Sequence, residues 1–124
     1  MFVLRLGRQP DQQVGWIVAD DDGTRRSPPS AGTLAEAAAG VQGRPVIVLV
    51  PATEALTTTI DLPVRGGPRL LAALPYALEE HIATDVEMMH FAAGDKRESG
   101  RRPVAAISRE SLESWLEQLE EAGI

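Results

Sequence analysis

The residues best placed to do chemistry are Glu79, Glu80 and His81, two carboxylates beside an imidazole. Such groups can transfer protons in general acid–base catalysis, and they can bind Zn²⁺ when they share one helix face at a spacing of three or four residues. Here the three side chains are adjacent in sequence, and the positions four residues after the two acids hold Ala83 and Thr84. We therefore interpret this group as a solvated helix end and predict no catalytic or metal site there.

The second histidine, His90, stands on a different predicted element, between Met89 and Phe91, where we expect it to be half-buried and hydrogen-bonded locally. A run of three aspartates, Asp20–Asp22, precedes Gly23 and matches a calcium-binding loop only in its charge. An EF-hand loop needs acidic ligands at alternating positions and a distant glutamate, which are absent here. We interpret this run as a solvated turn.

Motifs for nucleophilic catalysis and for phosphate binding are missing from the sequence. No G-x-S-x-G nucleophile elbow is present, and Gly66-Gly67 is not followed by the Lys-Ser/Thr pair of a P-loop. The absence of cysteine excludes disulfides and thiolate metal sites. We predict that the protein is not an enzyme and uses no cofactor and no metal.

Charge is distributed unevenly along the 124 residues, which carry a net charge of −6. Residues 1–53 hold five basic and five acidic side chains, whereas residues 54–124 hold seven basic and thirteen acidic ones. An acidic chain gains nothing by neutralising phosphates, so nucleic acid is not an expected partner. The longest apolar run, Val46 to Val50, is far shorter than the roughly 20 residues of a membrane span, and we expect a soluble segment.

The first half of the chain predicts the order β-β-(β)-α-β. Thr33 and Glu36 form a capping-box pattern at the start of the helix, and Gly40 and Gly43 are expected to end it. The uninterrupted apolar run at 46–50 is typical of a parallel strand covered on both faces. The predicted elements are strands at Phe2–Leu6, Val14–Ala19, Thr24–Ser27 and Val46–Val50, and a helix at Leu34–Ala39.

The second half predicts the order β-α-β-β-α. Its central helix follows Pro68 and places Leu70, Leu71, Leu74, Leu78 and Ile82 toward a buried side. Pro75 falls within this helix and is expected to kink it, because proline removes a backbone hydrogen bond. The other predicted elements are strands at Leu56–Leu62, Val86–Phe91 and Pro103–Ile107, and a last helix capped by Ser108 with Leu112, Trp115, Leu116 and Leu119 on one face.

Several short motifs in the second half carry a resemblance to a known family. These are Leu62-Pro63, Leu74-Pro75-Tyr76-Ala77-Leu78-Glu79-Glu80, Asp85-Val86-Glu87, His90-Phe91-Ala92 and the ending Ala122-Gly123-Ile124. The sequence of these motifs resembles the cytoplasmic region of type II secretion system protein L. The similarity covers the first part of that family's protein, so a transmembrane helix and a periplasmic domain would follow beyond Ile124.

The resemblance implies a fold class as well as a function. It implies an α+β fold in which residues 1–53 form half of an RNase H-like, actin-like ATPase sheet and residues 54–124 form a small inserted interaction subdomain. It also implies a location on the cytoplasmic face of the bacterial inner membrane, and a non-catalytic adaptor that recruits the secretion ATPase, protein E, through its N-terminal domain. The platform proteins M and F are further partners that the resemblance implies.

The actin-like relatives that bind ATP carry an Asp-x-Gly-x-Ser/Thr turn between their first two strands. This chain has Arg5-Leu6-Gly7-Arg8-Gln9 at the corresponding place, so an arginine replaces the acid and the hydroxyl residue is missing. We therefore predict no ATP hydrolysis. The alternative hypothesis is a nucleotide-binding, actin-like protein of the PilM type, which shares the fold but needs that turn.

The acids of the second half are the expected contacts for the secretion ATPase. The candidate protein-binding residues are Glu79, Glu80, Asp85 and Glu87, although an outward glutamate often serves only solubility. A third hypothesis is a dimerisation module, in which an uncovered apolar strip pairs with another copy to form a homodimer.

Overall fold

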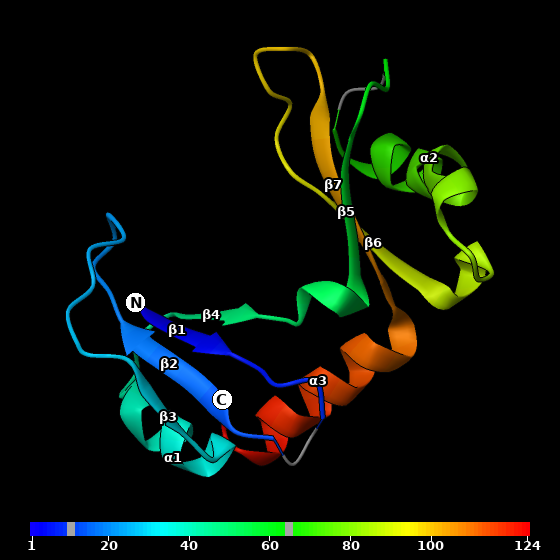
Figure 1. The fold of residues 1–124 in the computed structure, drawn as a ribbon. Helices are drawn as coiled ribbons and strands as arrows, with labels where there is room; N and C mark the ends of the chain where they lie inside the picture. The colour runs from blue at the N-terminus through cyan, green and yellow to red at the C-terminus, as the bar shows by residue number, and fades with distance from the viewer. Residues whose placement is uncertain (10–11, 64–65) are drawn as a thin grey trace. The chain divides into compact units, whose positions relative to one another are not determined.

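The structure is a computed structural model that describes residues 1–9, 12–63 and 66–124. It is a mixed α+β fold with two separate sheets, as predicted at this coarse level (Figure 1). Its residues form two compact units, called unit 1 and unit 2 below. Unit 1 contains Met1–Pro51 and Ser114–Ile124, and unit 2 contains Ala52–Glu113.

Unit 1 contains a four-stranded sheet in the order β3-β2-β1-β4. β1 pairs with β2 in antiparallel fashion and with β4 in parallel fashion, so the helix between β3 and β4 belongs to a crossover connection. The elements are β1 (Phe2–Arg5), β2 (Val14–Val18), β3 (Ser30–Gly32), α1 (Leu34–Val41) and β4 (Val46–Leu49).

Alternation along β1 builds the core of unit 1. Phe2 and Leu4 are fully buried on one face, while Val3 and Arg5 lie on the other. α1 begins with the predicted capping box, since the Glu36 amide donates to Thr33 Oγ1 at 3.1 Å and the Thr33 amide donates to Glu36 Oε1 at 3.2 Å.

The end of α1 and the third strand differ from the prediction. α1 continues through Gly40, where an added Cβ would lie 3.3 Å from the Phe2 ring, and ends at Val41. The short strand expected at 24–27 is reduced to an isolated antiparallel bridge between Ala19 and Arg25. It extends no further because the Ser27 hydroxyl, and not a strand carbonyl, accepts the Val18 amide at 3.0 Å. Pairing with β2 resumes only after the two prolines, at β3.

β4 is parallel, as its apolar run predicts, but it is the edge strand of the sheet and is not covered on both faces. The exposed fraction is 47% for Ile47 and 48% for Leu49, whereas Val46 and Val48 are half-buried. The register places Ile47 beside Val3, so the second apolar face of β4 continues across β1.

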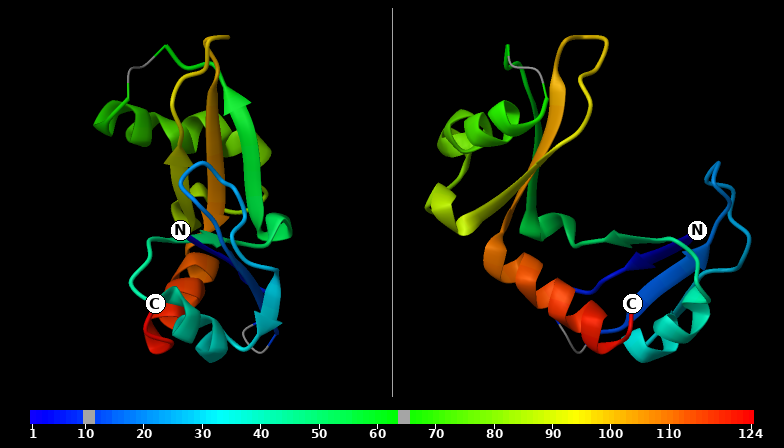
Figure 2. Two further views of the ribbon diagram at one scale, coloured as in Figure 1. Left: turned by 90° about the vertical axis from the view of Figure 1, so that its left-hand side faces the viewer. Right: turned by 180° about the vertical axis from the view of Figure 1, so that it is seen from behind.

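Unit 2 contains a three-stranded antiparallel sheet in the order β5-β7-β6. One helix, α2 (Pro68–Leu78), lies across one face of this sheet (Figure 2). The strands are β5 (Ala55–Ile60), β6 (Met89–Ala93) and β7 (Arg102–Ser108), and three short 3₁₀ turns are η1 (Ala52–Glu54), η2 (Glu79–His81) and η3 (Val86–Met88).

The core of unit 2 forms between α2 and the sheet. Leu70, Leu74 and Leu78 are buried one helical turn apart and pack with Val104 of β7. Leu71, which was predicted to face the core, is 56% exposed. α2 retains Pro75 inside a continuous helix and ends at Leu78, four residues before the predicted limit, where η2 takes over.

The strand predicted at 86–91 begins only at Met89. Residues 86–88 form η3 because the Asp85 side chain accepts the Glu87 amide at 3.5 Å and the Asp85 carbonyl accepts the Met88 amide at 3.0 Å. This shift sets which side chains of β6 face α2. Phe91 and Ala93 pack against the leucine core, and His90 lies on the opposite face.

The last helix, α3, spans Arg109–Glu121 and begins, as predicted, at Ser108, whose Oγ accepts the Ser111 amide at 3.0 Å. Trp115 is buried, but Leu116, predicted on the same face, is 55% exposed. None of the described helices is both long enough and apolar enough to cross a membrane.

Candidate functional site

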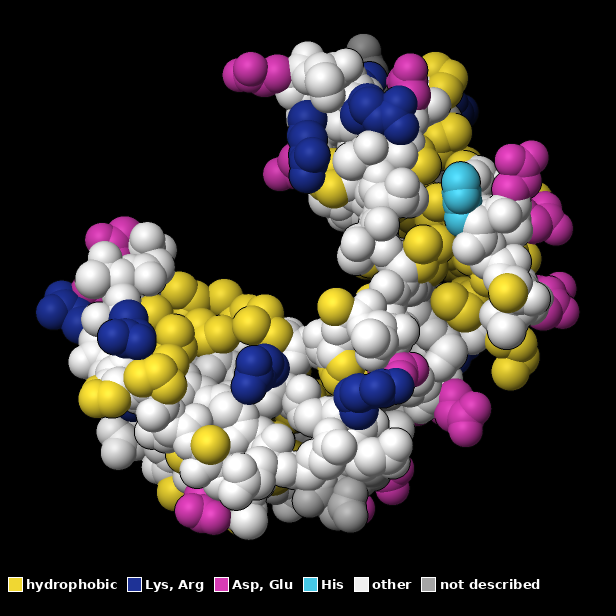
Figure 3. Space-filling model, in the orientation of Figure 1, with side chains coloured by type: hydrophobic (Ala, Val, Ile, Leu, Met, Phe, Trp, Pro, Cys, Tyr) yellow, Lys and Arg dark blue, Asp and Glu magenta, His cyan; other side chains and the backbone are white. Residues whose placement is uncertain are grey.

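The four acids singled out in the sequence lie on the two 3₁₀ turns that follow α2. Glu79 and Glu80 begin η2, Asp85 caps η3, and Glu87 lies within η3. All four are exposed. The space-filling view shows acidic side chains along the outer side of α2 and these turns, with hydrophobic side chains among them (Figure 3).

These carboxylates form a negative surface with little internal compensation. Among the described residues the single salt bridge joins Arg26 to Asp20 at 2.7 Å, so none of the four acids is ion-paired there. Residues 70–93 contain four carboxylates and neither lysine nor arginine. The charge of this stretch is therefore available to a partner.

The two histidines do not complete a site with the acids. His81 is exposed at the end of η2, and His90 is exposed on β6, which corrects the expectation of a half-buried ring. No set of three His, Cys, Asp or Glu side chains within the described residues could hold a metal ion. The arrangement offers exposed charge on the turns η2 and η3.

The aspartate run forms a tight turn that uses its own side chains. Asp22 Oδ1 accepts the Thr24 amide at 2.8 Å, and this backbone hydrogen bond lowers the pKa of Asp22 below its ordinary value because it stabilises the carboxylate. Asp20 pairs with Arg26, and Gly23 adopts a positive φ of 87°. Two of the three acids are thus engaged in holding the turn.

The turn between β1 and β2 has its described amides occupied by a side chain. Gln12 Oε1 accepts the amide of Arg8 at 2.7 Å and that of Gln9 at 3.2 Å. An added Cβ on Gly7 would lie 2.7 Å from Gln12 Cβ, so the turn is closely packed. In a phosphate-binding turn such amides donate to the ligand. Here the Arg8 and Gln9 amides donate to Gln12 Oε1, which occupies the position that a phosphate oxygen would take. Pro10 and Asp11 lie outside the described residues.

A second surface lies on the uncovered face of the unit 1 sheet, called the open face below. It is defined by Val3, Arg5, Ile17, Ile47 and Leu49, which the strand registers place side by side. Figure 3 shows hydrophobic side chains gathered over β1 and β4. Four of these five side chains are apolar, which favours contact with protein over contact with a charged ligand.

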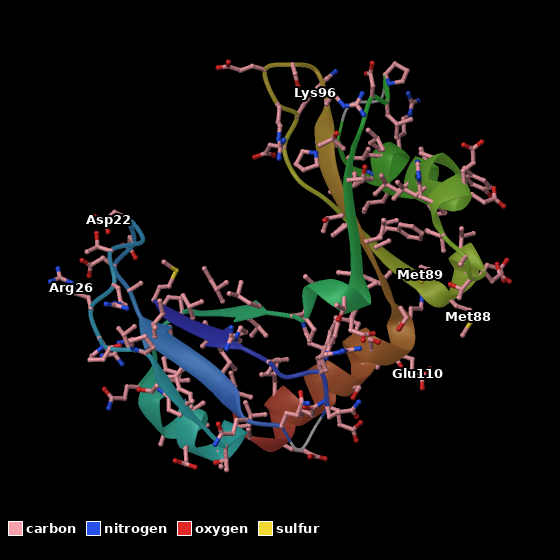
Figure 4. All side chains as sticks on the ribbon, viewed as in Figure 1. Asp22, Arg26, Met88, Met89, Lys96 and Glu110 are labelled. Atoms are coloured by element: carbon pink, nitrogen blue, oxygen red, sulfur yellow. The ribbon has the colours of Figure 1, made fainter. Side chains whose placement is uncertain are left out.

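Some exposed residues beside the acids were not anticipated from the sequence. Tyr76 is 78% exposed and Met88 is 60% exposed, and Figure 4 shows Met88 projecting outward from η3. The available signal was the spacing of Leu70, Leu74 and Leu78, which leaves Tyr76 on the opposite side of the helix. The turn geometry that exposes Met88 has no such signal.

The sequence matches one protein family over residues 2–124, described as type II secretion system (T2SS), protein L. A relative of that name from Dickeya chrysanthemi is 32% identical over 126 residues, covering 99% of this chain and 31% of the relative. Another from Pseudomonas aeruginosa is 35% identical over 117 residues, covering 94% of this chain and 28% of the relative. The chain thus spans about three tenths of the length of these relatives.

Two solved structures are similar in fold. One is the cytoplasmic domain of EpsL, an inner membrane component of the type II secretion system of Vibrio cholerae, with a TM-score of 0.77, 26% identity, and coverage of 99% of this chain and 53% of that one. The other is a PilM-PilN type IV pilus biogenesis complex, with a TM-score of 0.65, 16% identity, and coverage of 99% and 44%. At that identity the second match supports the fold alone.

Proposed function

Because the chain belongs to the type II secretion system protein L family, we propose that it is a non-catalytic adaptor that recruits the secretion ATPase, protein E, to the inner-membrane platform. The similarity to the cytoplasmic domain of EpsL supports a position on the cytoplasmic face of the inner membrane. In this proposal residues 1–53 are the RNase H-like portion, and residues 54–124 are the inserted subdomain that interacts with partners, although Ser114–Ile124 at its end group with unit 1.

The observation that carries the proposal is the unpaired acidic surface on η2 and η3. Glu79, Glu80, Asp85 and Glu87 are exposed, and none is ion-paired among the described residues. Exposed charge of one sign raises the rate of association with a partner of the opposite sign. We assign these four acids to the contact with the N-terminal domain of the ATPase, and leave the platform proteins M and F as further proposed partners.

The proposal is tested by binding of the purified chain to the N-terminal domain of the secretion ATPase from the same organism, at low and at moderate salt. We expect saturable binding that weakens as salt rises, because the proposed contacts are exposed charges. The matched control for Glu79→Gln/Glu80→Gln is Glu117→Gln/Glu120→Gln on α3. It removes two negative charges, as the test variant does, but from exposed positions outside η2 and η3. Absence of binding at both salt concentrations would refute the adaptor function.

A nucleotide-binding role of the PilM type is the alternative, and the structural similarity to the PilM-PilN complex favours it at the level of fold. The engagement of the Arg8 and Gln9 amides by Gln12 argues against it, since a phosphate would have to displace that side chain. Calorimetry with ATP and Mg²⁺ distinguishes the two roles. We expect no saturable heat, and measurable binding would favour the alternative.

Self-association is the remaining proposed partnership, and the open face of unit 1 supports it. Its edge strand β4 contains no charged residue and, among the described residues, pairs with a neighbour on one side only, which is the typical setting for pairing with another strand. A second copy could pair with β4 about a two-fold axis to form a homodimer.

A further inference from the structure

Large hydrophobic side chains are exposed unusually often on one stretch of unit 2. Six large hydrophobic residues are markedly exposed among the described residues, and three of them, Leu71, Tyr76 and Met88, fall within 18 residues of sequence. Tyr76, the single tyrosine of the chain, has the largest exposed fraction of the six at 78%. Isolated exposed apolar residues are ordinary, but a group of them beside unpaired charge marks an interaction surface.

The position of Tyr76 on α2 explains why unit 2 does not cover it. Leu74 and Leu78 point into the core, and Tyr76 lies between them in sequence, about 200° around the helix from each neighbour two residues away. Glu79 and Glu80 follow it by three and four residues, in the 3₁₀ turn η2 that continues from the end of α2.

A second exposed apolar side chain in this stretch is Met88, on η3. η3 packs against α2, and Met88 projects outward from it in Figure 4. Glu87 is the exposed neighbour of Met88 in the same turn. Residues 70–93 therefore contain an exposed aromatic ring, an exposed flexible thioether and four exposed carboxylates, and no lysine or arginine.

We propose that Tyr76, supported by Met88, is the anchor of the partner-binding surface, and that it enters an apolar pocket whose rim on the partner protein is basic. This inference rests on the adaptor function proposed above. It assigns most of the free energy of binding to the partner to Tyr76 and Met88, and not to the four acids. Tyrosine is enriched among interface residues that dominate affinity, because its ring buries a large area and is rigid. Charges at the rim act mainly on the association rate.

The charge of the stretch defines the chemistry of the partner. A surface with four unpaired carboxylates is repelled by an acidic partner and attracted by lysines and arginines. The exposed ring of Tyr76 also suits stacking against an arginine side chain. A partner with a basic rim and an apolar centre therefore satisfies both components of the surface.

The test compares Tyr76→Ala with Glu79→Gln/Glu80→Gln in binding kinetics against the N-terminal domain of the secretion ATPase. The Tyr76 side chain is exposed and its hydroxyl makes no hydrogen bond among the described residues, and alanine favours helix, so the variant should fold; circular dichroism checks this. We expect Tyr76→Ala to raise Kd roughly thirtyfold or more, through faster dissociation and at both salt concentrations. The double glutamine variant should slow association severalfold, and only at low salt.

The matched control is Leu116→Ala on α3, which removes an exposed leucine of comparable exposure outside the proposed surface. It should leave Kd unchanged. If the unmodified chain does not bind, both the adaptor function and the anchor are refuted. If it binds and Tyr76→Ala binds within twofold of it, or if Leu116→Ala loses as much affinity, the anchor alone is refuted.

Discussion

The apolar residues of α2 in unit 2 and of β4 in unit 1 differ in how far the described residues cover them. In unit 2, α2 buries Leu70, Leu74 and Leu78 against the sheet, so each helical turn on that side contributes one leucine to the core. In unit 1, β4 has an uninterrupted apolar sequence, yet Ile47 and Leu49 remain about half exposed. The difference shows that an apolar pattern encodes the burial a segment is suited to, which Leu70, Leu74 and Leu78 reach and Ile47 and Leu49 do not.

The largest expected effect tests whether unit 1 has a well-packed core despite its open face. Trp115→Ala removes a side chain that is 6% exposed and should lower the free energy of unfolding by about 3–5 kcal/mol. The measurement is urea unfolding followed by circular dichroism. Leu116→Ala, at the next position and 55% exposed, is the control and should change little. Equal losses for the two variants would mean that unit 1 is loosely packed.

The next effect tests the covered side of unit 2. Leu74→Ala creates a cavity under α2 and should cost about 2–5 kcal/mol of unfolding free energy, because Leu74 is fully buried in the leucine core. Leu71→Ala on the same helix removes an equal volume from a residue that is 56% exposed. Thermal and urea unfolding should separate the two variants clearly, and a large loss for Leu71→Ala would contradict the assigned orientation of α2.

The smallest effect on stability concerns the open face. Ile47→Lys should change the unfolding free energy by no more than about 0.5 kcal/mol, since the side chain is already about half exposed. It should nevertheless weaken self-association, because a lysine on an edge strand disfavours pairing with another strand. Sedimentation over a range of concentrations measures this. A monomer at every concentration for the unmodified chain would contradict the homodimer.

Much of the fold follows from local patterns in the sequence. The capping box of Thr33 and Glu36, the parallel direction of β4 and the cap at Ser108 were predicted, because each depends on residues close in sequence or on a single apolar run. The site was predicted in part. The structure places all four acids at exposed positions, but whether they bind a partner stays a prediction.

The errors arise where side chains compete with the backbone. The Ser27 hydroxyl accepts the amide of Val18, so the strand expected at 24–27 is reduced to one bridge. Asp85 caps the turn η3, so the strand expected at 86–91 begins only at Met89. The exposure of Leu71 and Leu116 depends on which helix face meets the sheet, and a broad apolar stripe does not specify its edges. The spacing of Leu70, Leu74 and Leu78 defines the buried side of α2 and gives no role to Tyr76 on the other side.

The division of unit 1 between two stretches of sequence has a consequence for synthesis. Unit 2 is continuous in sequence, whereas unit 1 needs Ser114–Ile124, which emerge from the ribosome only after all of unit 2. At roughly 5–20 residues per second this delay lasts several seconds. Unit 2 can therefore fold first. Until Ser114–Ile124 have been synthesised, the strands of unit 1 lack Trp115, and their apolar residues are accessible to chaperones before they can pack with the last helix.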